Sequence, residues 1–234
     1  MLKWQGGPPF NIGFRLVGDR GLLLDFGKEI SAEVNERVRR MALALQAKSL
    51  GGIIEVIPAY TTLLIRYDPL ILSLNALKEQ LREIEAGLQG LVLPEPKLTQ
   101  IPVVYGGPYG PDLEFVAQYH RLTPEEVIRL HCSKPYLIYM IGFMPGYPYM
   151  GELPEALITP RLKTPRLSVP KGSVAIAQRQ TGIYSMESPG GWQIIGRTPV
   201  ELFDPHRDPP ALLRMGDRVQ FYPISEKEFL EWNG

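Results

Sequence analysis

Residues 173–197 read SVAIAQRQTGIYSMESPGGWQIIGR and contain three short apolar segments, at 173–177, 182–186 and 192–197. Short runs of β-branched and aromatic residues, separated by glycine, proline and polar residues, are typical of β-strands. Three more such runs lie outside this stretch: YLIYMIGF at 136–143, VELF at 200–203 and DRVQFYP at 217–223. Six short strands without long helices between them predict an antiparallel barrel or sandwich.

The first ninety residues predict a different arrangement, a small α+β unit. Gly18–Gly21 separates two short apolar runs and indicates a hairpin. Ser31 and Ser73 each precede a stretch whose apolar residues recur at spacings of three and four, which predicts two amphipathic helices. Two β-rich runs, IIEVIP and TTLLIRYDP, lie between them. We therefore expect two helices packed on one face of a small sheet.

A proline-containing segment, LVLPEPKLTQIP, separates the two parts and resembles an interdomain linker. We place the boundary near residue 95, with domains at 1–95 and 96–234. A short helix from Pro111 is expected in the second domain. Thr123-Pro124-Glu125-Glu126 predicts the start of another, through a capping box with proline at the first helical position. The segment SEKEFLEWNG is a candidate terminal helix.

The composition excludes several classes of protein. The 234 residues carry 25 basic and 25 acidic side chains, a net charge of zero, which argues against nucleic-acid binding by bulk electrostatics. The N-terminal residues lack the apolar run of a signal peptide, and no apolar stretch is long enough to span a membrane. One cysteine, Cys132, excludes an internal disulfide and fits a reducing compartment. We expect a cytoplasmic protein that is not bound to a membrane.

Common catalytic motifs are missing. The chain has no GxxxxGK[ST], GxGxxG, HExxH or GxSxG sequence, and its three histidines are scattered, so no metal site is expected. Residues 142–200 instead carry six basic residues against three acidic ones. Arginine matches the oxygens of carboxylates and phosphates, so an anion-binding cleft is one interpretation and a solvated loop face is the other. The basic residues are Arg161, Lys163, Arg166, Lys171, Arg179 and Arg197, and the acidic ones are Glu152, Glu155 and Glu187.

Four other residues have candidate structural or chemical roles. His131 either interacts with the last carbonyls of its helix or carries a proton near the anion site. Trp192 forms a pocket wall or a core anchor. Glu187 acts as a general base or pairs with an arginine. Cys132 is expected to be a small buried apolar residue.

Several long motifs resemble the family of 5-oxoprolinase B subunits, which includes an inhibitor of a sporulation histidine kinase and proteins labelled allophanate hydrolase subunit 1. This sequence has Gln178 and Ser185 where glycine and proline are common in that family. The motifs are GFMPGYPYMGELP, PRLKTPRLSVPKGSVAIA, QTGIYSMESPGGWQIIGRTP, MGDRVQF, GDRGLLLDFG, GIIEVIPAYTTLLIRYDP and YGGPYGPDLEFVA.

The resemblance implies an α+β chain with a small N-terminal domain and a cyclophilin-like β-barrel. It also implies that the chain acts with the C and A subunits of the enzyme to open 5-oxo-L-proline to L-glutamate. The implied cofactor is ATP, with magnesium and bound mainly by a partner. Alternatives are inhibition of a histidine kinase by binding and a role related to urea carboxylase or allophanate hydrolase.

Within the matching motifs, cations are expected to bind the anionic groups of substrate or nucleotide in one cleft. The expected anion-binding residues are Arg166, Lys171 and Arg197. Gln180, Thr181 and Tyr184 are expected to orient the substrate, and His131 and Tyr184 are the candidate catalytic residues. The Gly-Pro motif 142–151 is expected to shape a loop rather than to react, or to bind a partner through Phe143, Met144, Tyr147 and Tyr149.

Overall fold

The computed structural model describes residues 12–232 and divides the chain into two compact units, Met1–Glu95 and Pro96–Gly234. The division falls inside the proline-containing segment that the sequence marks as a linker. The signal-peptide prediction concerns residues that lie mainly outside the described range, as do the last two residues of the C-terminal segment.

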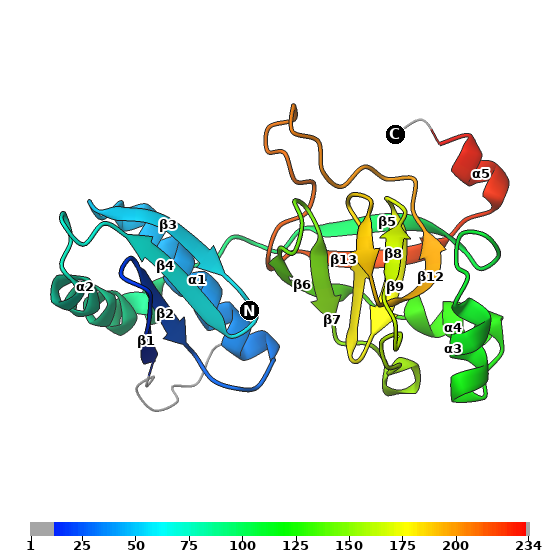
Figure 1. Cartoon of the computed structure of the whole chain (residues 1–234), viewed down its shortest axis with the longest axis horizontal. Coiled ribbons are helices and arrows are strands. Elements are labelled where there is room, and N and C mark those ends of the chain that lie inside the picture. Colours follow the sequence, from blue (N-terminus) through cyan, green and yellow to red (C-terminus); the bar gives the residue numbers. More distant parts are fainter. Residues whose placement is uncertain (1–11, 233–234) are drawn as a thin grey trace. The chain divides into compact units, whose positions relative to one another are not determined.

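The first unit is a four-stranded antiparallel sheet, in the order β1-β2-β4-β3, with two helices (Figure 1). The hairpin predicted at Gly18–Gly21 joins β1 and β2. Ser31 caps the first helix as predicted, and Ser73 caps the second. Alternate strand residues such as Leu22 and Ile65 are fully buried, as are Val38 and Leu77 of the helices. The elements are β1 Gly13–Val17, β2 Gly21–Asp25, α1 Ala32–Lys48, β3 Ile53–Pro58, β4 Thr62–Tyr67, α2 Leu74–Gly87 and the 3₁₀ turn η1 Leu88–Gly90.

The second unit is a closed seven-stranded barrel, in the order β10-β7-β6-β13-β5-β12-β9, which decides between the predicted barrel and sandwich. Its pairs are antiparallel except one: β13 runs parallel to β5. The elements are β5 Leu98–Tyr105, α3 Leu113–His120, α4 Pro124–His131, β6 Tyr136–Ile141, β7 Pro148–Gly151, the 3₁₀ turn η2 Glu155–Leu157, β8 Arg166–Val169, β9 Ser173–Ala177, β10 Gln180–Ile183, β11 Ser188–Gly190, β12 Gln193–Arg197, β13 Arg218–Pro223 and α5 Glu226–Leu230.

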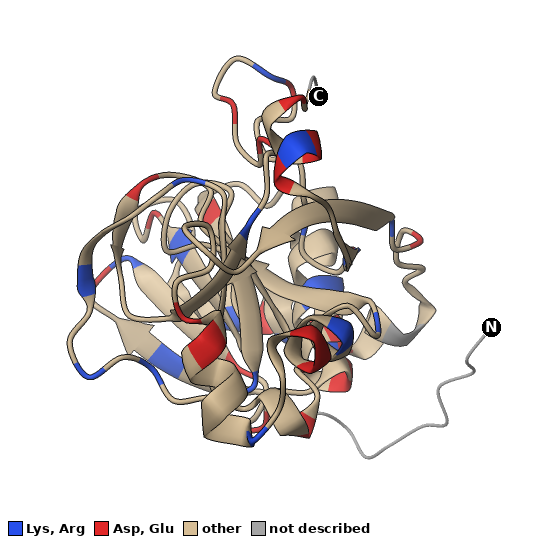
Figure 2. Cartoon of the chain, turned by 90° about the vertical axis from the view of Figure 1, so that its right-hand side faces the viewer, with Lys and Arg blue, Asp and Glu red and all other residues tan. Residues whose placement is uncertain are grey.

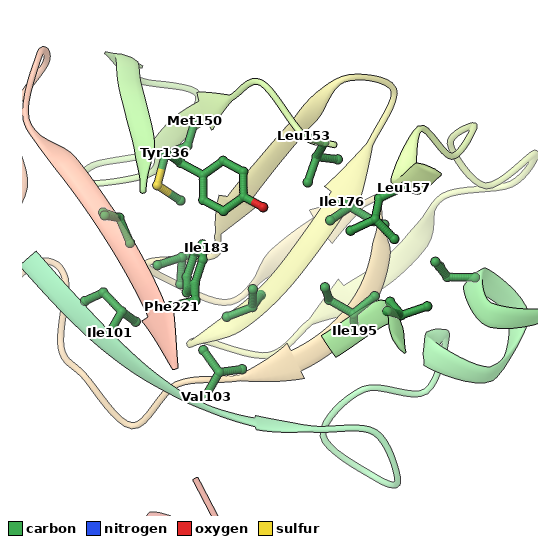
Figure 3. Packing of buried hydrophobic residues seen from close by; sticks show 14 of the residues in the cluster. Ile101, Val103, Tyr136, Met150, Leu153, Leu157, Ile176, Ile183, Ile195 and Phe221 are labelled. Atoms are coloured by element: carbon green, nitrogen blue, oxygen red, sulfur yellow. The ribbon is translucent and has the colours of Figure 1, made fainter. Parts of the chain in front are cut away.

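Every barrel strand contributes an apolar side chain to the interior, and these side chains converge in Figure 3. Along β9, Val174 and Ile176 belong to this core, whereas Ala175 and Ala177 belong to a second apolar cluster on the other side of the sheet. Because strand side chains alternate between faces, the two clusters define an inward and an outward face of the barrel wall. The candidate site residues are divided between these faces.

Two sequence predictions in this unit are wrong. VELF at 200–203 is not a strand and makes only an isolated bridge, between Phe203 and Ala211. Prolines at 199, 205, 209 and 210 remove the backbone donors that a strand ladder needs there. The loop expected at 142–151 contains strand β7, and the ribbon β8–β11 was not predicted at all.

Local signals located the helices of this unit well. The capping box of Thr123 and Glu126 begins α4 as predicted, and Ser225 and Glu228 form a second one at α5.

The turn between β9 and β10 contains one of the two departures from the resembling family. Gln178 has a φ of 52°, a left-handed conformation that favours glycine, which is the residue common in the resembling family.

Candidate functional site

His131 lies at the end of α4, fully buried in the barrel interior. Its ring stacks on Phe221 at a centroid distance of 4.6 Å and on Tyr136 at 5.5 Å. Its Nδ1 lies 2.8 Å from the Tyr105 hydroxyl, and its Nε2 lies 2.9 Å from Thr181 Oγ1. Burial lowers the pKa of His131 from 6.5 to about 3, so the ring is neutral at pH 7.

The surrounding hydrogen bonds define which ring nitrogen carries the proton. The Thr181 hydroxyl donates to the carbonyl of Ala175, so its oxygen accepts the Nε2–H of His131. Nδ1 then accepts from Tyr105, whose oxygen remains free to accept the Cys132 thiol proton across 3.3 Å. Each side-chain donor and acceptor in this series has a partner. A fully bonded network of this kind stabilises the interior of the barrel. The role of His131 as a proton carrier stays a prediction.

Tyr184 lies on the opposite, outward face of the barrel wall, in an aromatic cluster. Its ring makes an edge contact with Tyr147 at 5.3 Å, and Trp192 belongs to the same cluster, as the core-anchor interpretation predicted. Two glycines make room for the hydroxyl groups: a Cβ on Gly190 would lie 2.2 Å from Tyr184 Oη, and one on Gly182 would lie 2.5 Å from Tyr147 Oη. Burial raises the pKa of Tyr184, which keeps its hydroxyl protonated.

Arg166 borders this aromatic cluster but is already paired. Its Nη2 donates to Asp112 Oδ1 at 2.7 Å, and the other oxygen of Asp112 accepts the backbone N–H of Ile194 at 2.6 Å. The pair is largely shielded, with side chains 30% and 11% exposed. Asp112 therefore connects the loop before α3 to strand β12 and neutralises Arg166 in the same contact. This arrangement favours an architectural role for Arg166.

Lys171 and Arg197 lie beyond the aromatic cluster, where β9 begins and β12 ends. Lys171 makes an exposed ion pair with Glu201. Arg197 faces Ser173 across the strand pair β12–β9, and its guanidinium carbon lies 5.7 Å from the ring centre of Tyr109. The Arg197 Nε and the Ser173 Oγ are both buried without a hydrogen-bond partner.

The structure does not bring the predicted residues together in one place. His131 and Thr181 are hydrogen-bonded inside the barrel. Tyr184 belongs to the outward aromatic cluster, and Arg166 borders it. Lys171 and Arg197 lie near each other, where β9 begins and β12 ends. Gln180 opens β10, opposite Gly151 of β7. Figure 2 shows basic and acidic residues interspersed along the ribbon, in keeping with the balanced charge of the sequence.

Glu187, the 142–151 segment and Cys132 differ in exposure and in contacts. Glu187 accepts a hydrogen bond from the Ser168 hydroxyl at 2.7 Å. In the 142–151 loop Phe143 is 65% exposed, whereas Met144 and Tyr149 pack against the aromatic cluster. Cys132 is half-buried, and burial raises the pKa of its thiol.

Sequence reasoning missed several residues that now define the chemistry of the barrel. Tyr105, Asp112 and Ser173 bond or face the predicted residues from positions 24 to 54 residues away along the chain. Only Ser173, next to the Lys171-Gly172 pair, lay within the basic block. Within residues 12–232, no three His, Cys, Asp or Glu side chains gather as metal ligands. No helix in the same range is long and apolar enough to cross a membrane.

Comparison with known families gives a match over most of the chain. Residues 12–213 match the model described as carboxyltransferase domain, subdomain C and D. The chain belongs to this family. It is 42% identical to the B subunit of the 5-oxoprolinase of Bacillus subtilis over 223 residues, which cover 91% of this chain and 93% of that protein. The resemblance inferred from the motifs is therefore confirmed.

Two solved structures agree with the fold. A conserved uncharacterized protein, PH0987 from Pyrococcus horikoshii, is 46% identical, covers 92% of this chain and 99% of its own, and has a TM-score of 0.56. The protein TTHA0988 is 41% identical over 88% of this chain, with a TM-score of 0.78. The chain spans only 40% of the length of TTHA0988. In that protein, the counterpart of this chain is one part of a longer polypeptide.

Proposed function

We propose that this chain is the B subunit of a 5-oxoprolinase, an enzyme that uses ATP to open the lactam ring of 5-oxo-L-proline to L-glutamate. The observation that carries the proposal is the 42% identity to a 5-oxoprolinase B subunit over nearly the full length of both chains. Because the match includes both compact units, it extends beyond a shared barrel fold.

The contacts of the candidate residues support a subunit that needs partners. His131 is fully buried and bonded at both ring nitrogens, and Tyr184 is nearly as buried. Neither side chain is placed to meet a substrate by itself. We therefore assign the chemistry to a site completed by the C and A subunits, with this chain supplying recognition groups and part of the wall.

We assign ATP and its magnesium ion mainly to a partner subunit. The chain has no GxxxxGK[ST] sequence, and of the cations predicted to bind anions, Arg166 and Lys171 already have carboxylate partners. Arg197 remains as the cation suited to an oxyanion group of the substrate or nucleotide. The cytoplasm, where ATP is available, is the compartment that fits this assignment.

Reconstitution tests the proposal. The full chain is purified alone and together with candidate C and A subunits, and ATP-dependent formation of glutamate from 5-oxo-L-proline is measured. We expect activity from the complete set and none from any set that lacks this chain. Activity that is unchanged when this chain is omitted would falsify the proposal.

The second role, inhibition of a histidine kinase, stays a prediction with its own assay. Autophosphorylation of the kinase is measured with and without micromolar amounts of this chain, and a rate that does not change removes this role. The urea carboxylase or allophanate hydrolase alternative is separated by replacing 5-oxo-L-proline with urea or allophanate in the reconstituted reaction.

A further inference from the structure

Ser173 is an unusual residue for its position in the barrel wall. It opens β9 on the outward face, is fully buried, and its hydroxyl has no hydrogen-bond partner. An isolated buried hydroxyl is costly, since transfer from water without a compensating bond is unfavourable. Ser185, another buried serine, shows the usual solution: its hydroxyl donates to the carbonyl of Pro145 at 2.6 Å.

Arg197 is the direct cross-strand neighbour of Ser173. Paired residues of adjacent strands point to the same face, with Cβ atoms about 5 Å apart, so the two polar groups share one place on the outward face. The Nε of Arg197 is also buried without a partner. Two buried donors without acceptors, one of them part of a cation, therefore belong to directly paired residues of neighbouring strands.

The charges around this pair leave Arg197 uncompensated. Lys171 is paired with Glu201, and Glu226 accepts a hydrogen bond from the Tyr109 hydroxyl at 3.1 Å. Within residues 12–232, no carboxylate forms an ion pair with Arg197. A negatively charged hydrogen-bond acceptor would satisfy both Ser173 and Arg197.

We propose that Arg197 and Ser173 form the recognition point for a single oxyanion group, a carboxylate or a phosphate, of a small-molecule ligand. One anion oxygen accepts from the Ser173 hydroxyl, and another accepts from the Nε edge of the guanidinium, in the side-by-side geometry that arginine offers to such groups. The inference rests on the proposed function only for the ligand's identity, which would be 5-oxo-L-proline through its carboxylate or a nucleotide through its phosphates.

Tyr109 lies next to the guanidinium of this recognition point. Its ring lies beside the guanidinium, its hydroxyl bonds Glu226, and its other contact is Phe229 of α5, at a centroid distance of 4.9 Å. Because both donor atoms are buried, an anion reaches them only when a neighbouring side chain moves.

Binding to the full chain tests the proposal directly. Binding is measured by isothermal titration calorimetry with 5-oxo-L-proline, with its neutral amide 5-oxo-L-prolinamide, and with inorganic phosphate. We expect at least one of the two anions to bind and the neutral amide not to bind. Saturation by 5-oxo-L-proline identifies a carboxylate as the bound group, and saturation by phosphate alone identifies a phosphate group, the part that a nucleotide would supply. Failure of both anions at tens of millimolar overturns the proposal.

Two variants separate recognition from architecture. Ser173→Ala is expected to weaken anion binding about tenfold and to leave the urea unfolding midpoint unchanged or higher, because it removes a buried hydroxyl that has no partner. Ser185→Ala is the matched control and is expected to lower the midpoint without changing anion affinity. Arg197→Lys keeps the charge but removes the Nε donor, and is also expected to weaken binding at least tenfold.

The opposite results overturn the proposal. If Ser173→Ala binds the anion as tightly as the unchanged chain, or lowers the unfolding midpoint as much as Ser185→Ala, the hydroxyl is structural. The binding test and the test of the proposed function can fail separately. If the reconstituted enzyme with Ser173→Ala forms glutamate at unchanged rate and KM, the 5-oxoprolinase assignment stands. If the complete set of subunits is inactive, the binding measurements still decide whether Ser173 and Arg197 recognise an anion.

Discussion

Two groups of polar side chains in the barrel wall differ in how completely they are hydrogen-bonded. On the inward face, His131 and Thr181 form a hydrogen-bonded series with Tyr105 in which each donor meets an acceptor. On the outward face, Ser173 and Arg197 are paired across neighbouring strands but leave two buried atoms unbonded. Polar groups that satisfy one another maintain a fold, whereas unsatisfied neighbours are available to a ligand.

The largest effect is expected from breaking the inward network. His131→Ala removes a stacked ring and leaves Tyr105 and Thr181 without partners, so we expect the free energy of unfolding to fall by about 3–5 kcal/mol. Urea unfolding followed by fluorescence measures this. The control is His206→Ala, at an exposed position, which should change stability by less than about 0.5 kcal/mol. Equal losses in the two variants would mean that the inward network does not stabilise the barrel.

Acid is expected to act on the same residue. The pKa of His131 is about 3 in the folded barrel against about 6.5 unfolded, so between these values the unfolded chain binds one proton more. Stability is then fully present above about pH 6.5 and falls by about 1.4 kcal/mol per pH unit as pH decreases toward 3. Tyr105, Tyr136 and Cys132, the titratable groups around the ring, stay protonated throughout because burial raises their pKa values.

His131→Gln isolates this effect from the titration of carboxylates. Glutamine has a donor and an acceptor but no proton to gain, so the stability of this variant should depend less on pH between about 6.5 and 4. The measurement is urea unfolding of both proteins at several pH values across this range. Parallel pH dependences would show that His131 is protonated in the folded barrel after all.

The smallest effect is expected at the outward ion pair of Lys171 and Glu201. Both side chains are about half exposed, at 51% and 54%, so solvent screens their attraction. Lys171→Ala should lower the free energy of unfolding by less than about 1 kcal/mol, as measured by thermal or urea unfolding. A loss above about 2 kcal/mol would mean that the outward face also contains a tightly coupled network.

Local signals explain which parts of the fold were predictable. Thr123 and Glu126 lie three residues apart and cap their helix within a single turn, so the start of α4 was readable from the sequence. The segment 200–203 has strand-like residues but no partner strand. In the sequence, only the neighbouring prolines indicate that it does not form a strand. The parallel pairing of β13 with β5 depends on residues more than a hundred positions apart, and no local pattern specifies it.

The candidate site shows the same limit more strongly. Residue type suggested that Arg166 and Lys171 bind anions, but Asp112 and Glu201 already neutralise them from 54 and 30 residues away. His131 looked like a residue at a helix end, and its partner Thr181 lies 50 residues further on. Sequence reasoning could select chemically capable side chains, but only the pairing of strands shows which of them remain unbonded.

The parallel strand β13 also determines when this barrel can exist during protein synthesis. It lies between β5 and β6, so until residue 223 has emerged from the ribosome both of those strands keep a bare edge. The closed barrel therefore forms only after this strand has been synthesised, and until then β5 and β6 are exposed to pairing with other chains.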